Sequence, residues 1–551
     1  MGLVQKAFSD IITFSRSSNA TRVGPTGRVE YAPHNLLLYS EQFDNAAWTK
    51  DAPAGDGTST ITANVAAAPN GTITADRWQA TIGTSLISRL YQAVILQGNQ
   101  PAVISVYLKS NTSSSQSIQL REGYSTASIS ATVTTTWQRF TLPFTVVAGG
   151  NVEFQTAIFS GSCDILVWGA QLSVGPYPLD YTPTTSAAVY GPRFDYDPVT
   201  LAARGLLIEE QRTNVALYSE QFDVAYWAKT GASVTANAIA APDGTVTADK
   251  LVENTSLAAH AVYNFGILTF TAAAYTASAY IKAGGRNFVE IALYDGTVNA
   301  KAWFNLSTGA VGTLSGGATA SITSMGNGWY RCSATATMTA ASGGFAIYSA
   351  NADGVDTYTG DGASGIYAWG AQLEAGSFAT SYIPSLASSV TRSADVASVN
   401  TLSPWYNATE GTLFAEHQAI YPSQGNVVAS INDNSANRAV ELQHRGSTPS
   451  TQFASFTVVS GSITGQADAG GSSTFSAVRK WAGAYKANDF AASQNGGTVG
   501  TDTSGALPTS VTQMQLMAAY WGSSASSSGW LRRLAYYPRR LTNAELQALT
   551  A

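Results

Sequence analysis

The feature that most constrains the fold of this chain is an internal repeat. The hexapeptide YSEQFD occurs at Tyr39–Asp44 and again at Tyr218–Asp223. Further matched segments follow both copies in the same order: Ser105–Lys109 with Ser278–Lys282, Ile118–Gly123 with Ile291–Gly296, Ala157–Ser160 with Ala346–Ser349, and Trp168–Leu172 with Trp369–Leu373. Similar connectors, Arg28–Pro33 and Arg193–Pro198, precede the two copies. Such self-similarity predicts one structural unit that is used twice.

Within each copy the apolar residues alternate with polar ones. Ile104, Val106 and Leu108 show this pattern, and the turn signal Asn70-Gly71 illustrates how the runs are separated. Alternation with a period of two is typical of a strand that is buried on one face only. Short strands separated by turns predict two packed antiparallel sheets of jelly-roll size in each copy.

The repeat stops near Ser403. Strands are expected at Glu410–Phe414, within Met514–Tyr520 and at Trp530–Tyr537, and a hairpin at Lys480–Phe490 before Asn495-Gly496. Thr542 and Glu545 have the spacing of a capping box and predict one short terminal helix. The expected organisation is an attachment segment at 1–34, modules at 35–185 and 214–398, a connector at 186–213 and a third sandwich at 399–551.

Composition excludes several classes of protein. Only 12 % of residues are charged, the net charge is −6 and no basic run occurs, so nucleic acid is a poor partner. No apolar run reaches the length of roughly 18 residues that a membrane span needs, and the first residues lack the layout of a signal peptide. Cys163 and Cys332 fall in different modules and are expected to be buried free thiols.

The segment NLLLYSEQFDNAAW resembles the opening of jelly-roll carbohydrate-binding modules. The whole repeat, from RFDYDPVTLAARGLLIEEQRTN through WGAQLEAG to VTRSAD, looks like modules of phage and prophage tail and fibre proteins. The last part resembles concanavalin-A-like (laminin-G-like) lectins in EGTLF, KWAGAYKANDF and WLRRLAYYPRRLTNAEL. The expected fold class is therefore all-β, with tandem antiparallel β-sandwiches: two jelly rolls and one concanavalin-A-like sandwich.

This resemblance implies an appendage on the surface of a bacteriophage particle, a tail or head fibre made in the cytoplasm of the bacterial host. It would bind host cell-surface polysaccharide and contact other tail or capsid proteins, without insertion into a membrane. The N-terminal segment and the connectors would pack against the particle or a partner. A homo-oligomer such as a trimer is expected, because weak single sites gain avidity when they are linked.

Outward-facing aromatic side chains are the candidate sugar site, since a pyranose ring stacks on aromatic faces. If Val106 and Leu108 point into the core, one set of side chains in each copy points outward; these are Tyr107, Arg121 and Phe159 in the first and Tyr280, Tyr294 and Tyr348 in the second. The second copy is favoured because Tyr294 replaces Arg121. The alternative is that these side chains cover a connector or a neighbouring subunit. Trp48, Trp227, Trp168 and Trp369 are expected to close the cores.

The resemblance also implies a structural Ca²⁺ site at Asp44 and Asp223, with Asp164 as a second ligand in the first copy. The second copy departs from this pattern with Gly365 at the matched place. The alternative is an acid that caps a turn in solvent.

Catalytic patterns are absent from the sequence. None of the four histidines lies in a recognisable triad or metal motif, and the acids of the last part are scattered instead of alternating along one strand. The pair Glu209-Glu210 is interpreted as a solvated loop pair. The chain is therefore expected not to be an enzyme. A purely structural decoration protein and a polysaccharide depolymerase remain the alternatives.

Overall fold

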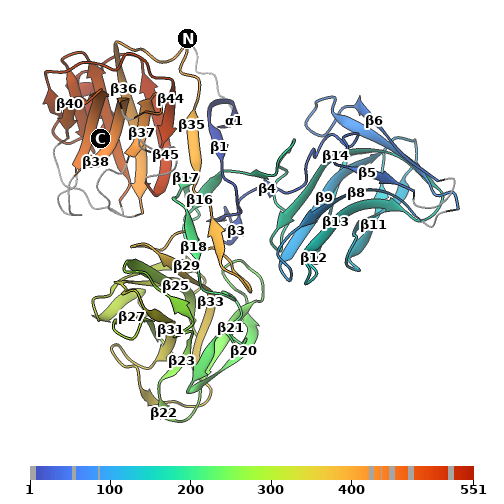
Figure 1. The fold of residues 1–551 in the computed structure, drawn as a ribbon, viewed down its shortest axis with the longest axis horizontal. Coiled ribbons are helices and arrows are strands. Elements are labelled where there is room, and N and C mark those ends of the chain that lie inside the picture. The colour runs from blue at the N-terminus through green and yellow to red at the C-terminus, as the bar shows by residue number, and fades with distance from the viewer. Residues whose placement is uncertain are drawn as a thin grey trace. The chain divides into compact units, whose positions relative to one another are not determined.

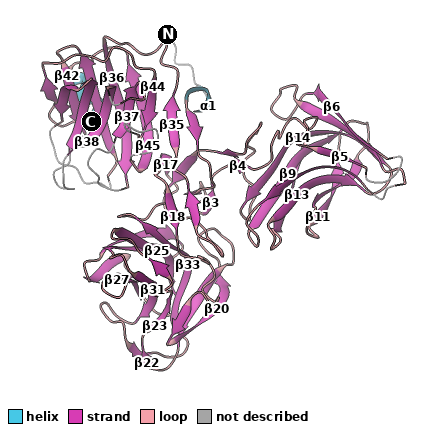
Figure 2. Cartoon of the chain, viewed as in Figure 1, coloured by secondary structure: helices cyan, strands magenta, loops and turns pink. Residues whose placement is uncertain are grey.

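The structure is a computed structural model that describes residues 8–52, 57–84, 87–420, 427–435, 437–445, 453–469, 477–518 and 527–551. Strands make up nearly all of its regular structure, and the pairings between neighbouring strands are antiparallel (Figure 2). The predicted all-β class of antiparallel sandwiches is confirmed. The chain divides into two compact units, which we call the small unit (Tyr31–Gly191) and the large unit (the described residues of Met1–Glu30 and Pro192–Ala551).

The small unit is the first module. One of its sheets has the order β11-β10-β13-β8-β5 and the other has the order β12-β9-β14-β7-β6. The strands are β4 (His34–Asn35), β5 (Thr49–Asp51), β6 (Thr58–Ala66), β7 (Ala75–Thr81), β8 (Ser88–Ile95), β9 (Pro101–Ser110), β10 (Gln116–Glu122), β11 (Ser128–Val133), β12 (Gln138–Thr145), β13 (Asn151–Ile158), β14 (Ser162–Val174) and β15 (Val189–Tyr190). Ile104, Val106 and Leu108 are fully buried, as their alternation predicts, and pack with Trp48 between the two sheets.

The second module repeats this plan inside the large unit. Its sheets have the orders β19-β23-β31-β26-β27-β28 and β20-β21-β33-β25-β30-β29. The strands are β18 (Arg212–Asn214), β19 (Ala228–Thr230), β20 (Ala232–Ile239), β21 (Ala248–Glu253), β22 (Leu257–Ala258), β23 (His260–Tyr263), β24 (Leu268–Thr269), β25 (Ala274–Ala283), β26 (Phe288–Tyr294), β27 (Asn299–Asn305), β28 (Ala310–Ser315), β29 (Thr319–Gly326), β30 (Trp329–Thr337), β31 (Ser342–Ala350), β32 (Tyr358–Thr359), β33 (Gly365–Ala375) and β34 (Val390–Arg392). Trp227 lies in its core, at the position matched to Trp48.

The C-terminal sandwich has two seven-stranded sheets, β1-β35-β44-β37-β38-β39-β40 and β16-β17-β45-β36-β41-β42-β43. Its elements, with those of the N-terminal segment, are α1 (Phe8–Ile11), β1 (Thr13–Ser15), β2 (Thr21–Val23), β3 (Val29–Tyr31), β16 (Arg193–Tyr196), β17 (Ala203–Ile208), β35 (Val396–Val399), β36 (Glu410–Ala419), β37 (Val427–Asn432), β38 (Arg438–Arg445), β39 (Phe453–Ser460), β40 (Ile463–Asp468), β41 (Arg479–Lys486), β42 (Phe490–Gln494), β43 (Gly500–Asp502), β44 (Gln513–Leu516), β45 (Gly529–Tyr537) and α2 (Asn543–Thr550).

Details of this sandwich test the expectations drawn from the sequence. The Thr542 capping box at the start of α2 is confirmed. The hairpin expected at Lys480–Phe490 is formed by β41 and β42, its turn includes Asn488 at φ 57°, and Asn495-Gly496 follows β42. The strand expected within Met514–Tyr520 corresponds to β44, and its last two expected residues, 519 and 520, lie outside the described residues.

Segments far apart in sequence complete the C-terminal sandwich. Strand β1 pairs with β35, and β17 pairs with β45, so the N-terminal segment and part of the expected connector are sheet strands (Figure 1). The sequence suggested that these segments pack against a particle or a partner. In the structure, their strands β1 and β17 instead pair with strands of the C-terminal sandwich.

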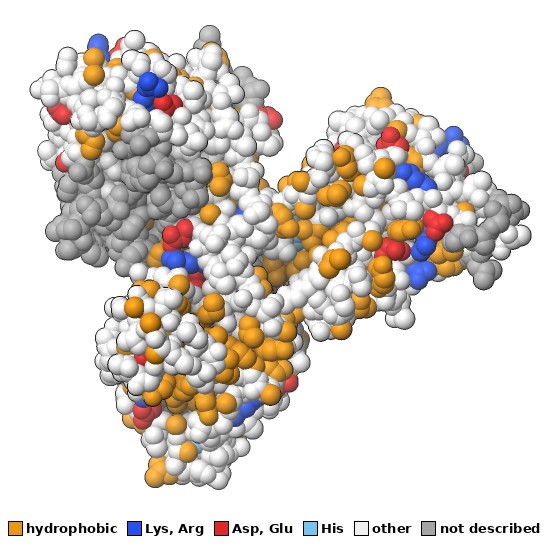
Figure 3. All heavy atoms as spheres, viewed as in Figure 1, with side chains coloured by type: hydrophobic (Ala, Val, Ile, Leu, Met, Phe, Trp, Pro, Cys, Tyr) orange, Lys and Arg blue, Asp and Glu red, His pale blue; other side chains and the backbone are white. Residues whose placement is uncertain are grey.

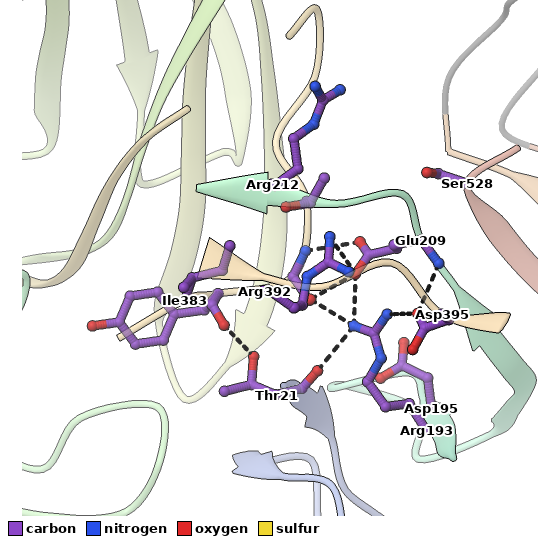
Figure 4. A network of polar contacts seen from close by, with 12 residues as sticks. Thr21, Arg193, Asp195, Glu209, Arg212, Ile383, Arg392, Asp395 and Ser528 are labelled. Atoms are coloured by element: carbon purple, nitrogen blue, oxygen red, sulfur yellow. Dashed lines mark hydrogen bonds and ion pairs between the residues drawn. The ribbon is translucent and has the colours of Figure 1, made fainter. Parts of the chain in front are cut away.

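A buried ion network joins these segments (Figure 4). Arg193 on β16 binds the carboxylates of Glu209 and Asp395, and Arg16 donates to Asp395 at 2.8 Å. Arg392 at the end of the second module lies 3.5 Å from Glu209. The interpretation of Glu209 as a solvated acid is wrong: its side chain is 1 % exposed, because Arg193 on β16 and Arg392, which is distant in the sequence, compensate its charge.

The remaining expectations about buried residues are met for the two cysteines and only in part for Trp168 and Trp369. Cys163 and Cys332 are free and buried. Trp168 and Trp369 are buried as well, although they lie with tyrosines on the outer side of their sheets instead of in the central cores. Within the described part of the chain, no helix combines the length and the apolar character needed to cross a membrane.

Candidate functional site

The candidate site is the outer face of one sheet of the second module, which has the order β19-β23-β31-β26-β27-β28 and is called the β19–β28 sheet. The other sheet, β20-β21-β33-β25-β30-β29, is called the β20–β29 sheet. Along β26, Val289, Ile291 and Leu293 point into the core, so the intervening residues face outward. The register places Glu290 opposite both Trp303 on β27 and Tyr348 on β31. Directly opposed residues of antiparallel strands share a face, so these three side chains form one transverse row.

An aromatic row runs along the edge of this face. The ring centroids of Tyr263 and Phe265 are 5.3 Å apart, and those of Phe265 and Tyr294 are also 5.3 Å apart. Tyr294 is 37 % exposed, and Tyr348 is partly exposed on the neighbouring strand. Accessible aromatic rings on a sheet face offer flat apolar surfaces to a ligand.

A buried carboxylate lies beside the aromatic side chains. Glu290 is fully buried, and its Oε1 lies 3.3 Å from Nζ of Lys301. Neither of its carboxylate oxygens accepts a hydrogen bond from the described residues, so the contact with Lys301 is an ion pair. Lys301 also binds Asp356 at 2.5 Å and lies 5.9 Å from the ring centre of Tyr348. Burial raises the pKa of Glu290 to about 7 despite the nearby Lys301 charge, whereas the hydrogen bond from Lys301 lowers the pKa of Asp356.

The first module lacks this cluster. In the first module, Ser117 and Thr132 are paired at the place where the second module pairs Glu290 with Trp303. Neither the carboxylate nor the indole is therefore present there. Its outer face carries arginines: Arg121 lies 5.4 Å from the ring centre of Phe159, which is 40 % exposed. The two copies therefore share a fold and differ in the chemistry of this face.

The predicted groove is wrong in one respect, since in each module the three predicted residues do not share one face. Tyr280 lies on β25 and Tyr107 on the matched β9, and both strands belong to the other sheet of their module. Tyr280 is only 3 % exposed, and its ring centroid lies 5.2 Å from that of Trp369. Only Tyr294 and Tyr348 of the second copy, and Arg121 and Phe159 of the first, lie on the face that was expected.

The expected calcium ligands do not gather either. Nε of Arg77 donates to Asp164 at 2.8 Å, and Asp44 and Asp223 are exposed. No group of three or more His, Cys, Asp or Glu side chains in the described ranges could hold a metal ion. The acid that fixes the YSEQFD turn is instead Asp76, which accepts a hydrogen bond from the amide of Phe43 at 2.7 Å.

Sequence reasoning missed Glu290, Lys301 and Trp303. Their signal was available, because each alternates with a core residue on its strand. The chemistry was hidden because the cluster depends on pairing β26 with β27, which the repeat alone does not specify.

Comparisons with known proteins assign neither a family nor a function to this chain. No protein-family model matches the sequence, and no curated protein matches it. Among solved structures, the N-terminal CBM22-1-CBM22-2 tandem domain of Xyn10C from Paenibacillus barcinonensis is 13 % identical with a TM-score of 0.22, covering 66 % of this chain and all of that one. The LG1-3 region of the laminin alpha2 chain is 8 % identical with a TM-score of 0.15, covering 83 % and 96 %. Likenesses at these scores establish neither a shared fold nor a shared function.

Proposed function

We propose that this chain is a non-enzymatic glycan-binding protein whose second module binds a saccharide on the outer face of the β19–β28 sheet. The observation that carries the proposal is the aromatic row that ends at Tyr294, next to Tyr348 and the Glu290–Lys301 pair. A sugar ring stacks on an exposed aromatic face, while charged and polar side chains bind its hydroxyls.

The polar side chains suit this role. Asp356 is partly exposed beside Lys301, so its carboxylate can accept a hydrogen bond from a sugar hydroxyl. Glu290 stays beneath Lys301 and holds the ammonium in place. The face therefore combines a hydrophobic platform with a fixed acceptor and a fixed donor.

We further propose that the chain is a tail or head fibre on the surface of a phage particle. It would be made in the host cytoplasm, bind host polysaccharide and assemble with other tail or capsid proteins. The support is the sequence resemblance of the repeat to phage modules. A homo-oligomer such as a trimer would raise the avidity of single weak sites.

A glycan array followed by calorimetry with the best ligand tests the proposal. Tyr294→Ala combined with Tyr348→Ala is expected to weaken binding about tenfold, because two stacking contacts are lost. Phe159→Ala in the first module is the matched control and should leave the affinity unchanged. Binding that survives the double substitution would sink this assignment, and a protein that binds no glycan would favour a structural decoration protein.

Hydrolysis of a polysaccharide is the second candidate function, and one observation favours it. The environments of Glu290 and Asp356 push the pKa values of two neighbouring carboxyls in opposite directions, as an acid and a base require. Lys301 lies against both carboxylates, however, which favours binding over catalysis. New reducing ends that appear with the native protein, but not with Glu290→Gln, would establish hydrolysis.

A further inference from the structure

The large unit contains a cavity of about 500 Å³ on the side of the second module that is opposite to the proposed glycan face. Its floor is the outer face of the β20–β29 sheet, and other walls come from the N-terminal segment, β16, β17 and the C-terminal sandwich. The lining residues used below are Tyr280, Arg331, Asp195, Arg204, Glu209 and Trp530. Cavities of this size hold small organic ligands.

Hydroxyl groups dominate the floor. The register opposes Ser321 to Ser333 and Thr319 to Thr335, so four hydroxyl side chains share one face of β29 and β30. All four line the cavity. Each hydroxyl can both donate and accept a hydrogen bond, which suits a ligand that carries several hydroxyls of its own.

Arg331 supplies the charge. Its guanidinium lies 5.3 Å from the ring centre of Tyr280 and donates from Nη2 to the Ser278 hydroxyl at 3.2 Å. Nε is buried without a hydrogen-bond partner, and Arg331 makes no ion pair with any described residue. Of the other arginines that line the cavity, Arg22 pairs with Glu30 at 3.0 Å and Arg204 with Asp197 at 2.9 Å.

The two carboxylates in the lining are already bound by this chain. Asp195 accepts from Nε1 of Trp530 at 2.7 Å, and Glu209 belongs to the buried ion network. Both are almost fully buried and already bonded, so within the described lining Arg331 is the arginine that lacks a direct ion pair, although the buried carboxylate of Glu374 attracts it.

The matched arginine of the first module, Arg139, has one more hydrogen-bond acceptor than Arg331. Arg139 is opposed to Tyr107 as Arg331 is opposed to Tyr280, and it likewise donates to the matched serine, Ser105. Its Nη2 also donates to the carbonyl of Leu179 at 2.8 Å. Nε lacks a partner in both arginines, but within the described chain Arg331 has no matched bond to a carbonyl. The second module thus leaves a donor available.

We propose that this cavity binds a carboxylate-bearing sugar unit of the uronic acid class, with the carboxylate on Arg331 and the ring hydroxyls on the Ser and Thr floor. Arginine binds carboxylates through two N–H donors, and since Nε of Arg331 is fully buried these would be donors of its two terminal Nη groups. The site is separate from the glycan face of the second module, because the two lie on opposite sheets.

Calorimetry with glucuronate, and with its neutral analogue glucuronamide, tests the proposal on the full chain. Glucuronate is expected to bind, with glucuronamide about tenfold weaker, since only the acid supplies a charged acceptor. Arg331→Gln should lower the affinity for glucuronate about tenfold, Arg331→Lys less, and Arg139→Gln not at all. A thermal unfolding curve for each variant shows that the chain is folded.

Two further arms complete the test. An oligosaccharide that contains internal glucuronate residues distinguishes a chain ligand from a free sugar acid: tighter binding than the monomer indicates the former, and weaker binding the latter. The proposal would be overturned by equal affinities for glucuronate and glucuronamide, by equal effects of Arg331→Gln and Arg139→Gln, or by no binding at millimolar concentrations. Tyr294→Ala should not change glucuronate binding, so the two sites can fail independently.

Discussion

Nη1 of Arg193 lies 2.6 Å from Oε2 of Glu209 in the fully buried ion network of the large unit. Burial alone would raise the pKa of Glu209, but the charges of Arg392 and Arg193 outweigh it and hold that pKa below its usual range. Arg193 also donates to the carbonyl of Thr21 and the hydroxyl of Ser381. One guanidinium therefore links the N-terminal segment, β16 and the second module.

Glu209→Gln is expected to destabilise the large unit by about 3–5 kcal/mol, because it leaves buried arginine charge uncompensated. The neighbouring substitution Glu210→Gln is the control. Glu210 is partly exposed and should change the free energy of unfolding by less than about 1 kcal/mol. Chemical denaturation of both variants measures the difference, and equal effects would contradict a structural role for the network.

Glu290 gives the second module an unusual dependence on pH. Because its folded pKa of about 7 exceeds the unfolded value of 4.5, the folded state binds more protons between these values and loses stability as the pH rises. Glu290→Gln should therefore stabilise the protein at about pH 8 by up to about 3 kcal/mol, with the gain disappearing near pH 4.5. Asp356→Asn, whose pKa shift has the opposite sign, should not stabilise it; denaturation curves across this pH range decide.

Two histidines meet inside the C-terminal sandwich. Arg479 donates to Nδ1 of His444 at 3.1 Å, so the His444 proton lies on Nε2, which is 3.2 Å from Nε2 of His417. Burial lowers the pKa of His417 to about 3, and burial also lowers that of His444. The unfolded chain then binds more protons below the usual histidine pKa near 6.5, and stability falls on acidification.

His417→Phe should make this acid loss shallower by up to about 1.4 kcal/mol per pH unit. The free energy of unfolding at a few pH values between about 7 and 5 provides the measurement. The variant Glu210→Gln, which changes a partly exposed acid, serves as the comparison, and a slope of stability against pH that His417→Phe leaves unchanged would refute the assignment.

The matched tryptophans test whether the two units unfold separately. Trp48→Ala and Trp227→Ala each empty a core position and should cost about 3–5 kcal/mol. We expect calorimetry to show two transitions, with each substitution lowering only the transition of its own unit. A single transition that both substitutions shift alike would show that the units unfold together.

Much of the fold is readable from the sequence for local reasons. The alternation at Ile104, Val106 and Leu108 predicted which side chains enter the core, and Thr542 with Glu545 predicted α2. Those patterns depend on neighbours within a few residues. The site was only half predicted: Tyr294 and Tyr348 lie on one face, but Glu290 and its partners were missed.

The sequence by itself determined that one sandwich is used twice and which face of each strand is apolar, because a strand's pleat is set along its own backbone. Only the tertiary structure decided which sheet each strand joins. Strands β25 and β26 follow each other in the chain but lie in opposite sheets, which separates Tyr280 from Tyr294. It also decided that Glu209 is buried. Only folding brings Arg392, which compensates its charge, and Asp395, which accepts a hydrogen bond from its backbone amide, close to it.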